Sequence, residues 1–282
     1  MKKIAHIFTL LSVLTTNTSN AQQAWTKPKG KFYTQIGASY LSYNSLINGT
    51  ADLIPLNKSF SDVTVQAYGE YGITDRLMVS GSIPFRAISS SNSTKTNAVK
   101  EGSLAAFSNI QAALTANFYN KDGVVISGKT QIGLPTAKYD APTGLRSGFD
   151  ATSVTPSVLV GFGHAKFFTS GEIGYVFRNN NYSNRFMMAA QIGKFFGTSK
   201  KHLGIIGFEL MNSLDNGTHD DGNSVFTGSY LDKQSFLSPN IKYGYKATSK
   251  ITTWLSAGVG LRGVTKYVGA SPGLSFSVSY QN

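Results

Sequence analysis

The chain contains no cysteine, so no disulfide bond or thiolate metal site can form within it. Charged residues make up only 14% of the sequence, and acids are the scarcer sign: 14 Asp and Glu against 26 Lys and Arg, for a formal net charge of +12. Beyond the N-terminal region, no apolar run approaches the roughly 20 residues that a membrane-spanning helix needs. Only a closed β-barrel would allow this sequence to cross a bilayer.

The N-terminus has the features of a cleavable secretion signal. Lys2 and Lys3 are followed by an apolar stretch over residues 4–14, which is too short for a membrane anchor. Small residues around Ala21 favour cleavage after that residue. Because no cysteine follows the apolar stretch, a lipid-anchored lipoprotein is excluded. We therefore expect a signal peptide over residues 1–21 and a β-barrel over residues 22–282.

Short segments that alternate apolar and polar residues fill the rest of the chain. Residues 63–73 show the pattern clearly, with Val63, Val65 and Tyr71 on one side and Thr64, Gln66 and Glu70 on the other. Successive side chains of a strand point to opposite faces of the sheet. After an export signal, this alternation favours apolar residues facing lipid and polar residues facing a water-filled lumen.

About twelve such segments predict an all-β fold: a transmembrane, antiparallel, up-and-down β-barrel, with ten or fourteen strands as alternatives. The predicted strands are residues 30–43, 62–73, 77–86, 103–120, 124–135, 151–163, 166–178, 185–195, 202–212, 236–246, 251–262 and 272–280.

Long, polar connections are expected over residues 44–61, 87–102, 136–150 and 212–235. Short turns join the strands at the other end. Short periplasmic turns and longer extracellular loops are typical of bacterial outer-membrane barrels, and we expect that location.

The last predicted strand resembles the terminal recognition strand of bacterial outer-membrane proteins. Its pattern is carried by Gly273, Phe276, Val278 and Tyr280, although the chain continues with Gln281 and Asn282. The expected partners are therefore the outer-membrane assembly machinery, membrane lipids and lipopolysaccharide, together with a small-molecule solute. Nucleic acid is not expected, since the chain is exported and carries no nucleic-acid-binding motif.

Charged residues within the predicted strands should point into the lumen, because a charge facing lipid costs roughly 2–4 kcal/mol at the bilayer midplane. The candidate pore-lining and rim residues are Arg86, Arg178, Arg185, Arg262, Lys129, Lys242, Glu70 and Glu172. The four arginines lie at the extracellular ends of their strands. They would select anions, pair with loop acids, or hold lipopolysaccharide phosphates. Lys129 and Glu172 lie at similar depth and are candidates for an ion pair across the lumen.

No catalytic, cofactor-binding or metal-binding residues are predicted. The four histidines are far apart in the sequence, and no His–Ser pair suits a phospholipase. One loop contains four acids, Asp215, Asp220, Asp221 and Asp232. It lacks the glutamate that closes an EF-hand loop, which favours a solvated acidic loop over a Ca²⁺ site.

Two segments are similar to a family of bacterial barrels named for the meta-pathway of phenol degradation. One is residues 68–85, whose turn has the sequence Tyr-Gly-Ile-Thr-Asp-Arg. The other is residues 128–136, where a strand passes into a long loop through Leu-Pro-Thr. The resemblance implies an outer-membrane channel, with small aromatic or hydrophobic compounds among its possible solutes.

Two functions remain open from the sequence. The first is a passive channel for small solutes, either hydrophobic or aromatic compounds or anions. The second is a non-conducting barrel with a structural or surface-adhesion role in the cell envelope, whose lumen would be closed by paired charges. Neither is an enzyme.

Overall fold

The structure is a computed structural model that describes residues 24–47, 52–92, 100–165, 167–197, 199–263, 268–269 and 272–282. The side chains of residues 57, 58, 92, 261–263, 268 and 269 are not part of this description. The expected signal peptide, residues 1–21, lies outside the described residues.

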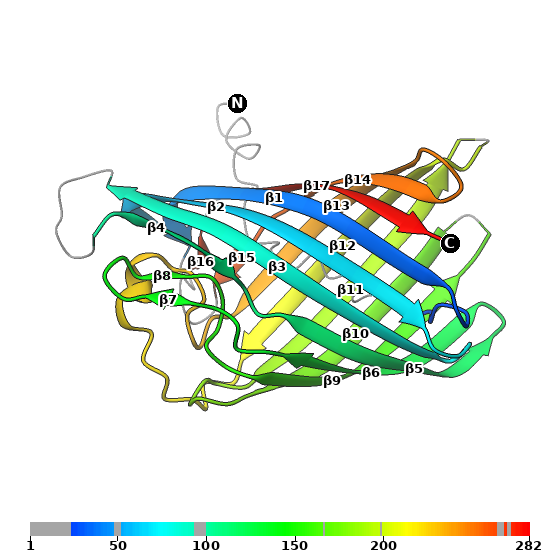
Figure 1. The fold of residues 1–282 in the computed structure, drawn as a ribbon, viewed down its shortest axis with the longest axis horizontal. Coiled ribbons are helices and arrows are strands. Elements are labelled where there is room, and N and C mark those ends of the chain that lie inside the picture. The colour runs from blue at the N-terminus through cyan, green and yellow to red at the C-terminus, as the bar shows by residue number, and fades with distance from the viewer. Residues whose placement is uncertain are drawn as a thin grey trace, which may run out of the picture.

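Antiparallel strands form one closed sheet (Figure 1). The strands of the barrel are β1 (Phe32–Ile47), β2 (Leu53–Gly72), β3 (Leu77–Asn92), β4 (Gly102–Phe107), β5 (Gln111–Lys121), β6 (Val124–Gly133), β9 (Ser153–Gly163), β10 (Phe167–Arg178), β11 (Arg185–Phe196), β12 (His202–Ser213), β13 (Phe236–Lys246), β14 (Ile251–Gly258), β15 (Leu261–Gly263), β16 (Val268–Gly269) and β17 (Gly273–Gln281). Three positions are each shared by two short strands: β4 with β5, β14 with β15, and β16 with β17. The described residues thus form a twelve-stranded barrel, which confirms the prediction.

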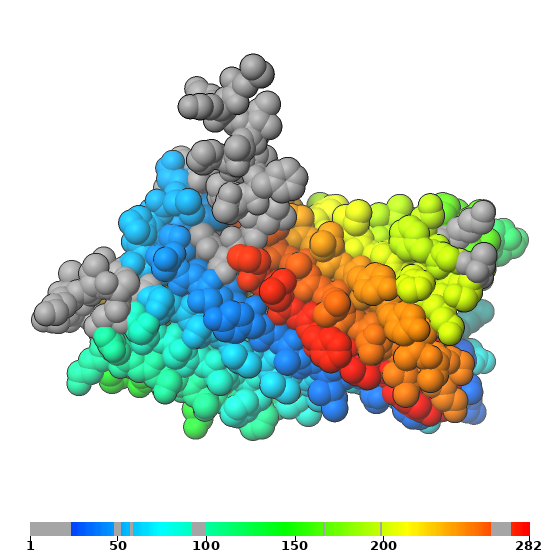
Figure 2. All heavy atoms as spheres, turned by 90° about the horizontal axis from the view of Figure 1, so that it is seen from above, coloured from blue at the N-terminus to red at the C-terminus, as the bar shows by residue number. Residues whose placement is uncertain are grey.

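Pairing between neighbouring strands closes the barrel. The last strand, β17, pairs with β1, and β12 pairs with β13. Figure 2 shows the red C-terminal strand next to the blue N-terminal one on the outer surface. Closure gives the long strands of the wall a partner on both sides, which a barrel in lipid requires, while the short strands β4, β15 and β16 each pair on one side. Among the described residues, no helix combines the length and the apolar character needed to span a membrane.

The orientation of the side chains agrees with the predicted alternation. Along β2, Val63, Val65 and Tyr71 are exposed on the outside, whereas Thr64 and Glu70 are buried on the inside. The same holds on the other strands, whose exposed residues include Ile36, Val158, Ile206 and Leu274. The outer surface is therefore an apolar band, and the inner surface is mostly polar.

Some predicted boundaries were wrong. Residues 44–61 and 87–102 were expected to be loops, but β1, β2 and β3 continue into them. In these extensions the alternation is inverted. Phe60 and Ile88 point inward and are buried, while Ser61 and Ser89 bond to each other on the outside at 2.7 Å. Apolar residues inside and polar residues outside are typical of a β-sheet whose outer face contacts water. The prediction looked for strands with apolar residues on the outside, so it missed these extensions.

Two predicted strands are interrupted. Residues 103–120 break between β4 and β5 at Ser108–Ile110, where Thr136 fills the gap by donating to the carbonyl of Ser108 and accepting from the amide of Ile110. Residues 251–262 break at Val259, whose amide donates instead to the carbonyl of Pro239 at 3.0 Å. Single residues from neighbouring elements complete the backbone hydrogen bonding at both breaks.

We expect a charge on the outer band to destabilise the barrel. Val158 lies at the centre of β9 and is 56% exposed. Val158→Arg should lower the free energy of unfolding in lipid vesicles by about 2–4 kcal/mol, since the guanidinium would face hydrocarbon. The matched control is Ala247→Arg, at an exposed position of a short turn, for which we expect little change. Equal stability of the two variants in urea titrations would contradict the inside-out arrangement.

Candidate functional site: the barrel lumen

Two long loops fold into one end of the barrel, the end opposite the short turns. They are residues 134–152, which contain the hairpin of β7 (Tyr139–Asp140) and β8 (Leu145–Arg146), and residues 214–235, which contain the short helix η3 (Gly222–Phe226). Figure 1 shows β7 and β8 beside the yellow loop at the left end. We call these two loops together the plug. Many of its side chains are buried, including Leu145 and Asp232.

The two loops of the plug bind each other. Arg146 donates from Nε to Ser224 Oγ at 2.7 Å, and its guanidinium lies over the Tyr139 ring at 3.9 Å. Gly144 has a φ of +68°, and a Cβ there would lie 2.3 Å from the carbonyl oxygen of Asn223. Only glycine allows both this backbone conformation and this close approach. The loops therefore form one packed unit.

A small apolar cluster fixes the plug to the barrel wall. Leu145 packs against inward-facing residues of the strand extensions: Leu41, Tyr43, Leu46, Phe60 and Ile88. The Tyr43 hydroxyl also donates to the carbonyl of Thr227 at 2.6 Å. The inverted alternation of the extended strands thus supplies the surface on which the plug rests.

Arginines and aromatic rings line the inner side of the plug. The guanidiniums of Arg178 and Arg185 lie 4.8 and 4.6 Å from the ring centroid of Phe149. The Phe149 ring also makes edge contacts with Tyr182 and Tyr230 at 5.5 and 5.0 Å. Cation–π contacts of this kind are strongest where water is excluded. Phe149 is therefore the centre of the contact between plug and wall.

Each of these arginines has further polar contacts. Arg178 bonds to Asp232 Oδ1 at 2.8 Å, with its side chain only 3% exposed. Arg185 Nη2 donates to the carbonyl of Leu231 at 3.1 Å. Arg86, 1% exposed, forms an ion pair with Asp62 of β2, and its guanidinium lies over the Tyr230 ring at 4.6 Å. All three hold the plug in place.

Asp232 is the most enclosed acid of the plug. Ser183 donates to its carboxylate from both the backbone amide and Oγ, each at 2.8 Å. Burial of the carboxylate opposes its charge, but these two bonds and the nearby Arg178 outweigh burial and lower the pKa of Asp232 below its ordinary value of 3.8. Its negative charge therefore stabilises the plug at neutral pH.

Two further ion pairs lie deeper in the lumen. Lys129 of β6 bonds to Glu172 of β10 at 2.6 Å, across the intervening strand β9. At the short-turn end, Lys27 lies 3.4 Å from Glu70 of β2. Both pairs are largely buried and connect neighbouring parts of the wall.

The described N-terminal residues enter the barrel from the short-turn end. Ala24 and Trp25 pack against Val125 and Leu159 on the inner wall. Ser127 Oγ donates to the carbonyl of Ala24, and the Trp25 ring meets the edge of Phe168 at 6.3 Å. This segment narrows the short-turn end of the barrel.

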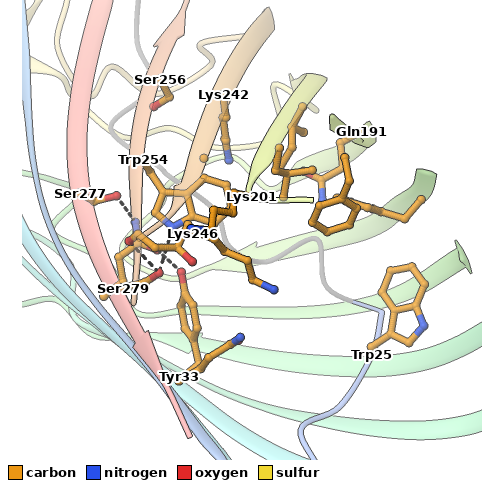
Figure 3. A pocket seen from close by; sticks show the side chains of 18 of the residues that line it. Trp25, Tyr33, Gln191, Lys201, Lys242, Lys246, Trp254, Ser256, Ser277 and Ser279 are labelled. Atoms are coloured by element: carbon orange, nitrogen blue, oxygen red, sulfur yellow. Dashed lines mark hydrogen bonds between the residues drawn. The ribbon is translucent and has the colours of Figure 1, made fainter. Parts of the chain in front are cut away.

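The described residues line two cavities in the lumen that have no lining residue in common. The short-turn cavity has a volume of about 480 Å³ and is drawn in Figure 3. The mid-lumen cavity, about 210 Å³, lies against Phe149 and Tyr230 of the plug. The inner wall is thus not filled completely by side chains.

The structure distributes the predicted site residues as follows. Arg86, Arg178, Arg185, Lys129 and Glu172 line the mid-lumen cavity, Lys242 lines the short-turn cavity, and Glu70 is buried beside Lys27. The backbone of Arg262 lies in β15, but its side chain lies outside the described residues. Arg178 and Arg185 meet at Phe149. Of the three roles considered for the arginines, pairing with a loop acid is seen for Arg178, which binds Asp232, whereas Arg185 binds the carbonyl of Leu231 and Arg86 binds Asp62 of β2.

Sequence reasoning missed the plug residues. The loop acids were expected to be solvated, but Asp221 and Asp232 are buried, so this expectation was wrong for both. Phe149, Arg146 and Tyr230 were not singled out, and neither were Trp25 and Trp254 in the short-turn cavity. A signal was available in the sequence, because Phe149 and Tyr230 lie in these loops and large aromatic side chains are more often buried than exposed.

The remaining candidates for chemistry are dispersed. His202 bonds to the Tyr243 hydroxyl at 2.6 Å, and His219 stacks on Tyr182 at 3.6 Å. In the part of the chain that the structure describes, no group of three His, Cys, Asp or Glu residues could hold a metal ion.

The fold and the lumen define a twelve-stranded β-barrel of the outer-membrane type with a plugged polar interior. The chain belongs to the family described as "Putative MetA-pathway of phenol degradation", whose model matches residues 15–277. This confirms the resemblance inferred from residues 68–85 and 128–136.

Solved structures agree in fold. An outer membrane channel from Pseudomonas putida F1 is 13% identical, with a TM-score of 0.70 over 92% of this chain and 98% of that one. The NanC porin is 8% identical, with a TM-score of 0.50 over 88% and 98% of the two chains. No curated protein matches the sequence.

We expect acid to loosen the plug. Because the pKa of Asp232 is lowered on folding, its contribution to stability is complete above pH 3.8 and is lost as the pH falls through the lower folded-state value. Asp232→Asn should reproduce this loss at neutral pH, increasing amide hydrogen exchange in residues 214–235 by an amount equivalent to about 1.5–3 kcal/mol.

The control for this prediction is Asp215→Asn, an exposed acid of the same loop. Its amide hydrogens in residues 214–235 should be protected from exchange as in the unaltered protein at every pH, after correction for the pH dependence of the intrinsic exchange rate. Unchanged protection in Asp232→Asn would show that the carboxylate does not hold the plug.

Proposed function

We propose that this protein is a passive channel for small solutes in a bacterial outer membrane. The observation that carries the proposal is the polar inner wall, which encloses two cavities of about 480 and 210 Å³ within an apolar outer band. An eight-stranded barrel is filled by its own side chains, whereas this wider one retains space. On this proposal, the short turns face the periplasm and the plug faces the cell exterior.

The lining favours polar or charged solutes in water over free lipid. Gln66, Gln111 and Gln131 line the mid-lumen cavity, and Gln35 and Gln191 line the other. Such amides can exchange hydrogen bonds with water or with a passing solute at little cost. The plug at the outer end is then a gate whose movement opens the path.

The family membership and the fold both support a channel. A similar barrel, the one from Pseudomonas putida F1, is an outer membrane channel. The family description mentions phenol degradation, which supports small aromatic compounds as one class of solute. On the same grounds, membrane lipids and lipopolysaccharide would contact the outer band, and β17 would be the strand bound by the assembly machinery.

A non-conducting structural barrel is the second candidate. It is favoured by the ion pairs Arg86–Asp62, Arg178–Asp232 and Lys129–Glu172, which brace the lumen. Buried pairs of this kind add rigidity but do not by themselves create a path. The two candidates differ in one measurable property, electrical conductance.

We expect planar-bilayer recordings of the folded protein to show discrete conductance steps. Phe149→Ala should increase the conductance or the open fraction, because it removes the ring that joins Arg178 and Arg185 to the plug. The matched control is Phe118→Ala, a ring that is 71% exposed on the outer surface. It should leave the conductance unchanged.

The channel proposal fails if neither the unaltered protein nor Phe149→Ala conducts. In that case the braced lumen would be closed, and the structural role would be favoured. Equal increases in Phe149→Ala and Phe118→Ala would instead show that the plug is not the gate.

A further inference from the structure

The short-turn cavity is lined by lysines and tryptophans, and a water-filled path needs neither of these residue types. Four lysines line it: Lys27, Lys201, Lys242 and Lys246. Both tryptophans of the chain, Trp25 and Trp254, line it as well. No acidic residue is part of this lining in the described chain. We propose that this cavity is a binding site for small aromatic carboxylates, an inference that rests on the proposed channel function.

The lysines are arranged from the mouth of the cavity inward. Lys201 lies at a short turn, where its carbonyl accepts from the amide of Lys246 at 2.8 Å. Lys246 and Lys242 are on the same face of β13, four residues apart, a distance of about 13 Å along a strand. An anion that enters at Lys201 and Lys246 is therefore drawn toward Lys242.

The four lysines differ in their partners. Lys27 is paired with Glu70. In contrast, Lys201, Lys242 and Lys246 take part in no salt bridge within the described residues. Glu209 influences Lys242 electrostatically from the mid-lumen side, but it does not line the short-turn cavity. The cavity therefore has an excess of positive charge, and its position inside the barrel limits screening by salt.

Glycines in the wall hold the two tryptophan rings in place. A Cβ on Gly244, the β13 residue directly opposite Trp254, would lie 2.6 Å from the Trp254 ring. The Trp254 indole also donates to Ser279 Oγ at 3.0 Å. In the same way, a Cβ on Gly161 would lie 2.8 Å from the Trp25 ring. Each ring thus rests on a glycine of the wall, and Figure 3 shows the two rings on either side of the cavity.

This arrangement suits a ligand with one aromatic ring and one carboxylate. The ring would pack against an indole, an interaction worth about 0.5–1.5 kcal/mol beyond burial of the area. The carboxylate would accept charge-assisted hydrogen bonds from the lysines. A neutral aromatic compound lacks the second contribution, and an aliphatic acid lacks the first. The volume of about 480 Å³ lies within the range of small-molecule sites.

Tryptophan fluorescence is a direct test, because the only two tryptophans of the chain line the site. The folded protein is titrated in detergent with benzoate, benzyl alcohol and hexanoate. Benzoate should change the fluorescence with a Kd at least about tenfold lower than either of the others. Equal affinity for benzyl alcohol would overturn the role of the lysines, and equal affinity for hexanoate would overturn the role of the rings.

Two pairs of lysine substitutions test whether the preference for benzoate arises in this cavity. Lys242→Gln combined with Lys246→Gln should abolish the preference for benzoate over benzyl alcohol. The matched control is Lys121→Gln combined with Lys194→Gln, two exposed lysines that do not line the cavity. It should bind benzoate as the unaltered protein does. A preference that survives the first pair, or is lost in the control pair, would overturn the proposal.

Conductance in KCl separates this inference from the channel proposal. Conductance steps without preferential benzoate binding would overturn the binding site alone. Preferential binding by a protein that does not conduct, either unaltered or as Phe149→Ala, would support the binding site and overturn the channel.

Discussion

Closure of the sheet is the constraint on which the rest of this structure depends. Pairing of β12 with β13 and of β1 with β17 closes the sheet, so the backbone groups of the long strands are paired on both sides where the wall faces hydrocarbon. Once the wall is closed, its two faces have opposite requirements. The outer face must be apolar, and the inner face is free to carry buried charges such as Glu172 and Lys129. Charged side chains are therefore found on the inner face, where they do not contact lipid.

The inversion of the alternation along β1, β2 and β3 marks the change of surroundings. In the middle of these strands, Val63 and Val65 face outward; farther along, Phe60 and Ile88 face inward and serines cover the outside. The same strand thus behaves as a membrane barrel over one part and as a water-soluble barrel over the next. The apolar inner surface created in this way is what Leu145 of the plug packs against. The wall therefore supplies the apolar surface on which the plug packs.

Three buried arginines, Arg86, Arg178 and Arg185, bind the plug. Arg178 is neutralised by Asp232, and Arg86 by Asp62, while Phe149 and Tyr230 cover their flat faces. A guanidinium can satisfy a carboxylate at its edge and an aromatic ring on its face at once, which lysine cannot do. Four lysines, in contrast, line the short-turn cavity together with the two tryptophans. The lumen is thus divided into a braced outer part and a more open, basic inner part.

The sequence by itself determined the barrel, its twelve strands and the orientation of residues such as Val158 and Glu70, because alternation with a period of two is a local property that the membrane imposes on every strand. It also placed Lys129 and Glu172 at the same depth, where the structure joins them. Only the tertiary structure decided that residues 134–152 and 214–235 fold inward, that Asp232 is buried against Arg178, and that Trp25 and Trp254 share a cavity. These contacts join positions far apart in the chain, and no local periodicity encodes which loop turns into the lumen.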